Sequence, residues 1–100
     1  MPEIQLRLKE DALITHWVQS GQHTQNMEAG TIYIGNFGVT LAYARSNDGV
    51  PTDKSEDGGQ TWTYYFWGEN AAFHYTDILI PIYNSKGEKL GVVSHTSITP

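Results

Sequence analysis

Apolar and polar side chains alternate along the first segment of the chain. From Glu3 to Lys9 the sequence reads EIQLRLK, with an apolar residue at every second position. This period of two is typical of a half-buried β-strand. Glu10 and Asp11 then mark a turn, and the pattern of residues 12–19 predicts a second strand. A short helix is the rival interpretation for 12–19, because its apolar pattern is less regular.

Polar and glycine-rich stretches divide the rest of the chain. Residues 20–30 lack periodicity and predict a long loop, of a length that often carries function. Residues 46–53 are turn-forming types, and Asn84–Gly87 predicts a tight hairpin turn. Pro81 cannot donate a backbone hydrogen bond, so it indicates a strand edge or a bulge. The segments between these stretches predict strands at 31–34, 37–45, 61–67, 71–76, 77–83 and 88–98.

These short, closely spaced strands indicate one all-β domain over residues 1–100. Seven to nine strands with frequent turns favour an antiparallel β-sandwich or an open barrel. A chain of 100 residues allows one hydrophobic core, and aromatic residues at 12% indicate a packed fold rather than disorder. No well-capped amphipathic helix is visible in the sequence.

The charge of the chain is low and acidic. The formal net charge is −5, and the six basic residues lie far apart. Because nucleic-acid binders need a cationic face that neutralises phosphates, no nucleic-acid partner is expected. No segment approaches the roughly 20 apolar residues of a membrane span, so no membrane insertion is expected. The basic residues are Arg7, Lys9, Arg45, Lys54, Lys86 and Lys89.

The chain contains no cysteine, which excludes disulfides, thiolate metal sites and a cysteine nucleophile. Small secreted domains often need disulfides, so their absence favours a cytoplasmic protein. The charged first ten residues also lack the apolar run of a signal peptide. Secretion by a non-classical route is left open.

One segment carries a recognisable motif. Ser55 to Trp62 reads SEDGGQTW, which resembles the Asp-box, the S-x-D-x-G-x-T-W hairpin of sialidases and related β-propellers. Independently of the resemblance, an Asp side chain can cap backbone donors of its own turn, and Gly supplies the positive φ. The resemblance implies that Ser55 and Asp57 bind the turn backbone and that Trp62 enters the core. In these families the motif is a fold element rather than an active site.

The resemblance does not extend to the activities of those families. A sialidase would need several copies of the motif and three clustered arginines, whereas the chain has one copy and only Arg7 and Arg45. The motif also occurs in small microbial ribonucleases, which need a basic cleft that the acidic charge disfavours. The two halves of the chain do not align, so an oligomeric propeller built from two blades per chain is not expected.

The strand after this hairpin is aromatic on both faces. Trp62, Tyr64 and Phe66 share one face, and Tyr65 and Trp67 share the other. If Trp62 points inward and the strand is regular, Tyr65 and Trp67 point outward. An exposed aromatic pair near Asn and acidic residues suits sugars, because rings stack on C–H faces and planar polar groups bind hydroxyls. Ordinary core packing and contact with a protein partner are the alternatives.

We therefore expect a small lectin-like protein that binds a glycan or glycoprotein in a shallow site, without a cofactor. Self-association is expected as well, since single shallow sugar sites are weak. The alternative is a protein-interaction module, such as an inhibitor, an immunity protein or a virion or structural component. That alternative predicts an exposed sheet edge or apolar patch and a stable oligomer. The predicted ligand-binding residues are Trp67, Tyr65, Asn70, Asp48, Asn47 and His74.

Catalytic and metal sites are not indicated. None of His16, His23, His74 and His95 has the i, i+4 spacing of a helical zinc site. The acidic stretch 48–69 lacks the register of a calcium-binding EF-hand. Nucleophile-elbow and phosphate-loop motifs are absent too. We expect no enzyme; the remaining enzymatic alternative is a small hydrolase that uses His74 with Asp77.

Overall fold

A computed structural model describes residues 3–18, 21–44, 49–68 and 71–95. These residues form eight strands and their turns, which confirms the predicted all-β fold. Over the described ranges the chain has no helix, and hence no helix able to cross a membrane. The strands are β1 (Ile4–Leu8), β2 (Ala12–Val18), β3 (Gly21–Met27), β4 (Ile32–Ala44), β5 (Val50–Ser55), β6 (Thr63–Trp67), β7 (Phe73–Tyr83) and β8 (Lys89–His95).

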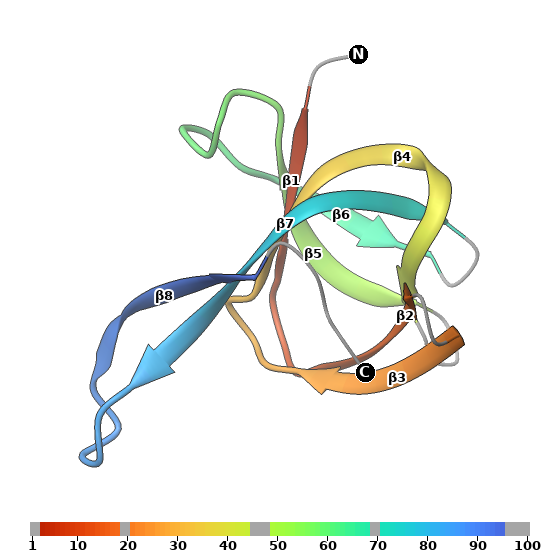
Figure 1. Ribbon diagram of the computed structural model, residues 1–100. Helices are drawn as coiled ribbons and strands as arrows, with labels where there is room; N and C mark the ends of the chain where they lie inside the picture. The colour runs from red at the N-terminus through yellow and green to blue at the C-terminus, as the bar shows by residue number, and fades with distance from the viewer. Residues whose placement is uncertain (1–2, 19–20, 45–48, 69–70, 96–100) are drawn as a thin grey trace.

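The long strand β4 is the hub of the sheet. Every strand pair is antiparallel, in the order β3-β2-β4-β1-β5-β6, and β7 pairs with both β4 and β8 (Figure 1). The first half of β4 lies between β1 and β7, whereas its end pairs with β2. Two register shifts along β4 let it bend, so the sheet curls around the core as a β-sandwich or open barrel does.

One of these shifts explains the glycine in the middle of β4. At Gly35 the backbone passes so close to β7 that an added Cβ atom would lie 2.0 Å from the carbonyl oxygen of His74. Only glycine fits such an approach. The prediction of separate strands at 31–34 and 37–45 is therefore wrong: one strand, β4, continues through the register shift at Gly35.

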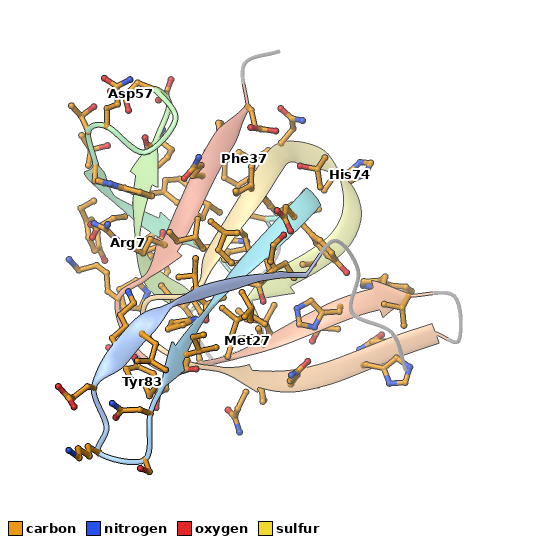
Figure 2. The ribbon with its side chains drawn as sticks, turned by 60° about the vertical axis from the view of Figure 1, so that its left-hand side comes forward. Arg7, Met27, Phe37, Asp57, His74 and Tyr83 are labelled. Carbon is orange, nitrogen blue, oxygen red and sulfur yellow. The ribbon has the colours of Figure 1, made fainter. Side chains whose placement is uncertain are left out.

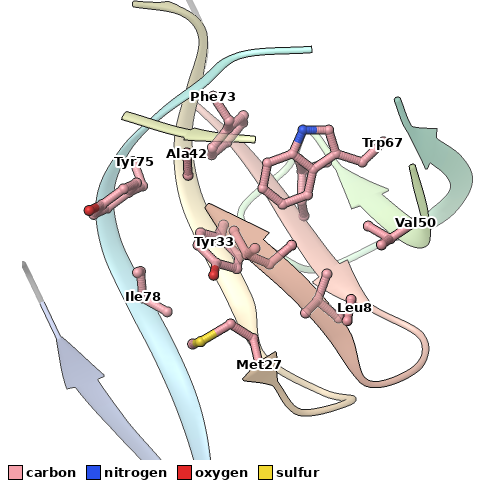
Figure 3. Close-up of a cluster of buried hydrophobic side chains, with 12 residues drawn as sticks. Leu8, Met27, Tyr33, Ala42, Val50, Trp67, Phe73, Tyr75 and Ile78 are labelled. Atoms are coloured by element: carbon pink, nitrogen blue, oxygen red, sulfur yellow. The ribbon is translucent and has the colours of Figure 1, made fainter. Parts of the chain in front are cut away.

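The core lies inside the curled sheet (Figure 3). The inward residues predicted for the first strand, Leu6 and Leu8, are buried as expected. Aromatic rings meet edge to face at its centre, where the ring centres of Tyr33 and Trp67 are 5.4 Å apart. The buried cluster comprises Leu6, Leu8, Ala12, Ile14, Met27, Tyr33, Ala42, Val50, Trp67, Phe73, Tyr75 and Ile78.

Two segments predicted as loop and turn are strands. Most of 20–30 forms β3, which pairs with β2 along its whole length. This strand is polar because it lies at the edge of the sheet, where backbone hydrogen bonds hold it and only Met27 is buried. Likewise, 50–53 belongs to β5 rather than to a turn. The helix proposed as the rival interpretation for 12–19 is also wrong, because that segment forms β2.

The last two strands form a long hairpin. The segments predicted separately at 71–76 and 77–83 are one strand, β7. The edge position predicted for Pro81 is confirmed, because the pairing of β7 with β4 ends at Leu79 and only β8 then remains as a described neighbour. The predicted turn is confirmed too: Asn84 Oδ1 accepts hydrogen bonds from the backbone N–H of Lys86 (2.9 Å) and Glu88 (3.0 Å).

Candidate functional surfaces

The turn between β5 and β6 is held by one carboxylate. Asp57 Oδ1 accepts hydrogen bonds from the backbone N–H of Gln60 (3.0 Å) and Thr61 (2.9 Å) and from the Ser55 hydroxyl (2.8 Å). The Thr61 hydroxyl donates to Asp57 Oδ2. These hydrogen bonds lower the pKa of Asp57 to about 2, and the one from the Thr61 hydroxyl contributes most. The prediction that Asp57 caps its own turn is confirmed. Its carboxylate is therefore occupied by the turn rather than offered to a ligand.

Trp62 does not enter the core, so its predicted role as core anchor is wrong. Its half-buried ring lies outside the core cluster, and the guanidinium carbon of Arg7 is 4.0 Å from the ring centre. Trp67 is the tryptophan of the core. It is 0% exposed, and its Nε1 donates a hydrogen bond to the Ala71 carbonyl oxygen at 2.7 Å.

The predicted outward pair is therefore wrong as well. The alternation along β6 is regular, but its two faces are exchanged. Tyr65 and Trp67 stand opposite Thr52 and Val50 of β5, which are both buried, so this face of β6 covers the core. Tyr65 is half-buried beside the ring of Phe37, 5.4 Å between ring centres, and Trp67 offers no surface to a sugar.

Of the polar residues predicted to surround the pair, the structure describes His74. Asn47, Asp48 and Asn70 lie outside the described residues. His74 is exposed on β7, opposite Asn36 of β4. The hydrolase alternative would use His74 with Asp77. In the structure both carboxylate oxygens of Asp77 accept the hydroxyl of Ser94, at 2.6 and 2.7 Å.

The outer surface of β1, β5 and β6 carries a group of aromatic side chains. We call Trp62, Tyr64 and Phe66 the aromatic face; Tyr64 is 63% exposed and Phe66 44%. Asp53 stands opposite Tyr64, and its carboxylate lies 3.4 Å from the guanidinium of Arg7. The ammonium of Lys9 is also 3.4 Å from Asp53. The aromatic face thus borders a group of two cations and one anion, in which both cations share the single carboxylate.

The β7–β8 hairpin extends beyond the curled sheet. We call Ile80–Val93 the arm; Figures 1 and 2 both show it projecting from the body, with Tyr83 near its end. Pairing of β7 with β4 has ended before the arm begins, so the arm is a two-stranded ribbon. Its exposed large apolar side chains include Leu90, which is 64% exposed. The set is Ile82, Tyr83, Leu90, Val92 and Val93.

A shallow pocket of about 330 Å³ lies where β3 ends. It is lined by Asp11, Asn26, Met27 and Glu28. Met27 is a core residue, whereas Asp11 and Glu28 bring two carboxylates. Asp11 Oδ1 accepts the backbone N–H of Ala29 at 2.8 Å. Within the described ranges no three or more His, Cys, Asp or Glu side chains gather as metal ligands would, so the pocket is not assigned a metal.

One titratable pair lies in the core. His16 Nε2 is 2.9 Å from the hydroxyl of Tyr33, and both side chains are fully buried. Burial, and then the charge of His23, lower the pKa of His16 to about 4. Burial raises the pKa of Tyr33 well above its usual value. Both groups are neutral near pH 7 and have no access to a substrate, so they belong to the core.

The strand pattern contained part of this arrangement. Arg7 and Lys9 lie on the polar face of the first predicted strand, which becomes the border of the aromatic face. The pairing of β5 with β1, which brings Asp53 beside Arg7, was not predicted, because residues 46–53 were expected to form a turn. The arm residues read as ordinary strands, and no local signal showed that their partners end at Leu79.

Comparison with models of known protein families, with curated proteins and with solved structures finds no match to this chain. The exposed surfaces therefore carry what can be inferred about its function. Two of them stand out, the arm and the aromatic face, with the pocket beside the base of the arm.

Proposed function

We propose that this chain is a protein-interaction module that binds its partner through the arm. The observation that carries the proposal is a two-stranded ribbon with apolar side chains exposed on both faces. Val93 stands opposite Ile80 on the face that also holds Ile82, and Val92 stands opposite Pro81 on the other. Exposed apolar patches on otherwise polar proteins mark interaction sites.

The architecture of the arm adds a second reason. An isolated two-stranded hairpin is marginally stable in water, so a ribbon of this kind gains stability when another surface covers it. The outer edge of β8 has no described neighbour, which leaves backbone N–H and C=O groups available to a strand of the partner. We place this interaction in the cytoplasm, as the cysteine-free sequence favours.

Capture experiments test this proposal. The immobilised full chain should retain protein partners, identified by mass spectrometry, that the Leu90→Ser/Val92→Ser variant loses. Both side chains are exposed, so the variant should keep the fold, as circular dichroism can verify. The matched control is Tyr64→Ser/Phe66→Ser, which removes equally exposed apolar surface elsewhere and should leave capture unchanged. Equal retention by wild type and the arm variant would contradict the proposal.

Carbohydrate binding is the second candidate function, on a different surface from the one expected. The aromatic face favours it, because Tyr64 and Phe66 are exposed two positions apart on one strand, hence about 7 Å apart. Their rings can stack on the C–H faces of a sugar, and the neighbouring Arg7 and Asp53 supply planar groups for its hydroxyls. The pairing of Arg7 with Asp53 neutralises both charges beside the rings, which suits a neutral glycan.

A glycan array is the measurement for this second candidate. Binding by the wild type should fall about tenfold or more in Tyr64→Ala/Phe66→Ala, because both stacking rings are removed; tenfold corresponds to about 1.4 kcal/mol. The control is Tyr83→Ala, an exposed tyrosine on the arm, which should bind as the wild type does. Absence of any bound glycan at millimolar sensitivity would exclude the candidate.

A further inference from the structure

We infer that the partner of the arm is a second copy of this chain, and that each arm binds the pocket of the other copy. This inference rests on the proposed function and names its partner. It follows from the charge of the arm, the lining of the pocket and the position of the pocket relative to the arm.

The arm differs in charge from the rest of the chain. Its charged residues are Lys86, Glu88 and Lys89, which give a formal charge of +1. The whole chain has −5, so the residues outside the arm have −6. An arm of one copy is therefore attracted to the body of another, whereas two bodies repel each other.

The pocket offers what the end of the arm requires. Its Asp11 and Glu28 supply carboxylates for the two lysines near the turn. Its Met27 is 3% exposed and belongs to the core, so the accessible lining is mainly polar. The contact therefore depends on opposite charges on the two surfaces.

The position of the pocket points to another copy rather than to the arm of the same chain. The backbone N–H of Thr31 donates to the Glu28 carbonyl oxygen and closes a turn that contains Gly30. A Cβ atom added to Gly30 would lie 3.4 Å from Pro81 Cγ, at the base of the arm. Met27 also belongs to the same buried cluster as Ile78, which precedes the arm on β7 (Figure 3). The end of an extended arm cannot reach its own base. The arm of a second copy, lying antiparallel, places its end there.

Two-fold symmetry completes both contacts at once. When two arms lie antiparallel, the end of each meets the base of the other, and the same patches are used on both copies, as in an isologous dimer. The outer edges of the two β8 strands, which have no neighbour among the described residues, can then face each other. The expected assembly is a dimer with two identical arm–pocket contacts.

Charge exchange between the two surfaces tests the inference. Sedimentation of the wild-type chain at roughly 100 µM should show a dimer. Lys86→Glu/Lys89→Glu makes the arm acidic, and Asn26→Lys/Glu28→Lys makes the pocket basic. The second variant keeps Asp11, which accepts the backbone N–H of Ala29. Each variant alone should dimerise at least about tenfold more weakly, and their equimolar mixture should restore a heterodimer, in which both contacts are again complementary. Lys86→Arg/Lys89→Arg is the matched control and should dimerise as the wild type does.

Three outcomes would overturn the inference: a monomeric wild type, variants that dimerise as tightly as the wild type, or a mixture that stays monomeric. If the wild type is monomeric but captures another protein through the arm, the proposed function stands and only the identity of the partner is wrong. If capture does not depend on the arm either, both fall. Melting curves of each variant separate loss of the dimer from loss of the fold.

Discussion

Replacement of Trp67 by alanine is expected to lower the free energy of unfolding by about 3–5 kcal/mol, the range for large aromatic side chains in a core. The indole is fully buried and meets the rings of Tyr33 and Phe73 at 5.4 and 6.0 Å between centres. Alanine would leave a cavity among these rings and remove the hydrogen bond to the Ala71 carbonyl. Urea unfolding followed by circular dichroism measures the loss.

Trp62 provides a matched control for this experiment. Trp62→Ala removes the same side chain from the outer surface, where it loses its contact with Arg7, a cation–π interaction of about 0.5–1 kcal/mol at exposed sites. The expected loss is therefore much smaller than for Trp67. If Trp67→Ala does not fold, Trp67→Phe should still fold. Its free energy of unfolding should be positive but lower than that of the wild type. A larger loss at Trp62 than at Trp67 would show that Trp62 is the core anchor after all.

Acidification from pH 6.5 to pH 4 is expected to destabilise the fold by up to about 3 kcal/mol through His16 alone. The pKa of His16 is about 4 in the folded chain, below its usual 6.5. The main cause is burial of the ring, and the smaller cause is the charge of His23. Between these two pH values the unfolded chain binds a proton that the folded chain does not. The contribution of a neutral His16 is therefore complete above pH 6.5 and lost as the pH falls to about 4.

The measurement is the free energy of unfolding in urea at pH 7 and at pH 4.5. The His16→Gln variant keeps a polar partner for the Tyr33 hydroxyl but cannot titrate, so its stability should depend less on pH over this window. His74→Gln, at an exposed position, should retain the wild-type dependence. Asp57 has a pKa of about 2 in the folded chain, lowered from 3.8, so its contribution to stability is lost mainly below pH 4, outside the range measured. An unchanged pH dependence in His16→Gln would contradict the assignment.

Local patterns predicted the elements whose structure depends on neighbours in sequence. The alternation of 4–8, the cap of Asp57 and the turn at Asn84 all appear in the structure as expected. The polar edge strand β3 could not be predicted this way, because backbone pairing with β2 holds it and its side chains carry no apolar period. The continuity of β4 through Gly35 could not be predicted either, because a glycine within a strand can mark its end as well as a bulge.

The candidate surfaces depended on distant partners and were therefore predicted only in part. The residues of the arm were assigned to strands, but its exposure follows from where β4 stops pairing with β7. The pocket joins Asp11, after β1, to residues at the end of β3 that were expected in a loop. Neither arrangement has a signature within a short window of sequence.

The sequence by itself determined that β6 has two aromatic faces, with Tyr65 and Trp67 on one and Tyr64 and Phe66 on the other, because side chains alternate along a strand. It could not determine which face is buried, since both are equally apolar. Only the tertiary structure decided this. Pairing with β5 places the first face over the core and leaves the second in solvent. A register between distant strands, not a local preference, thus selects the rings that a ligand can reach.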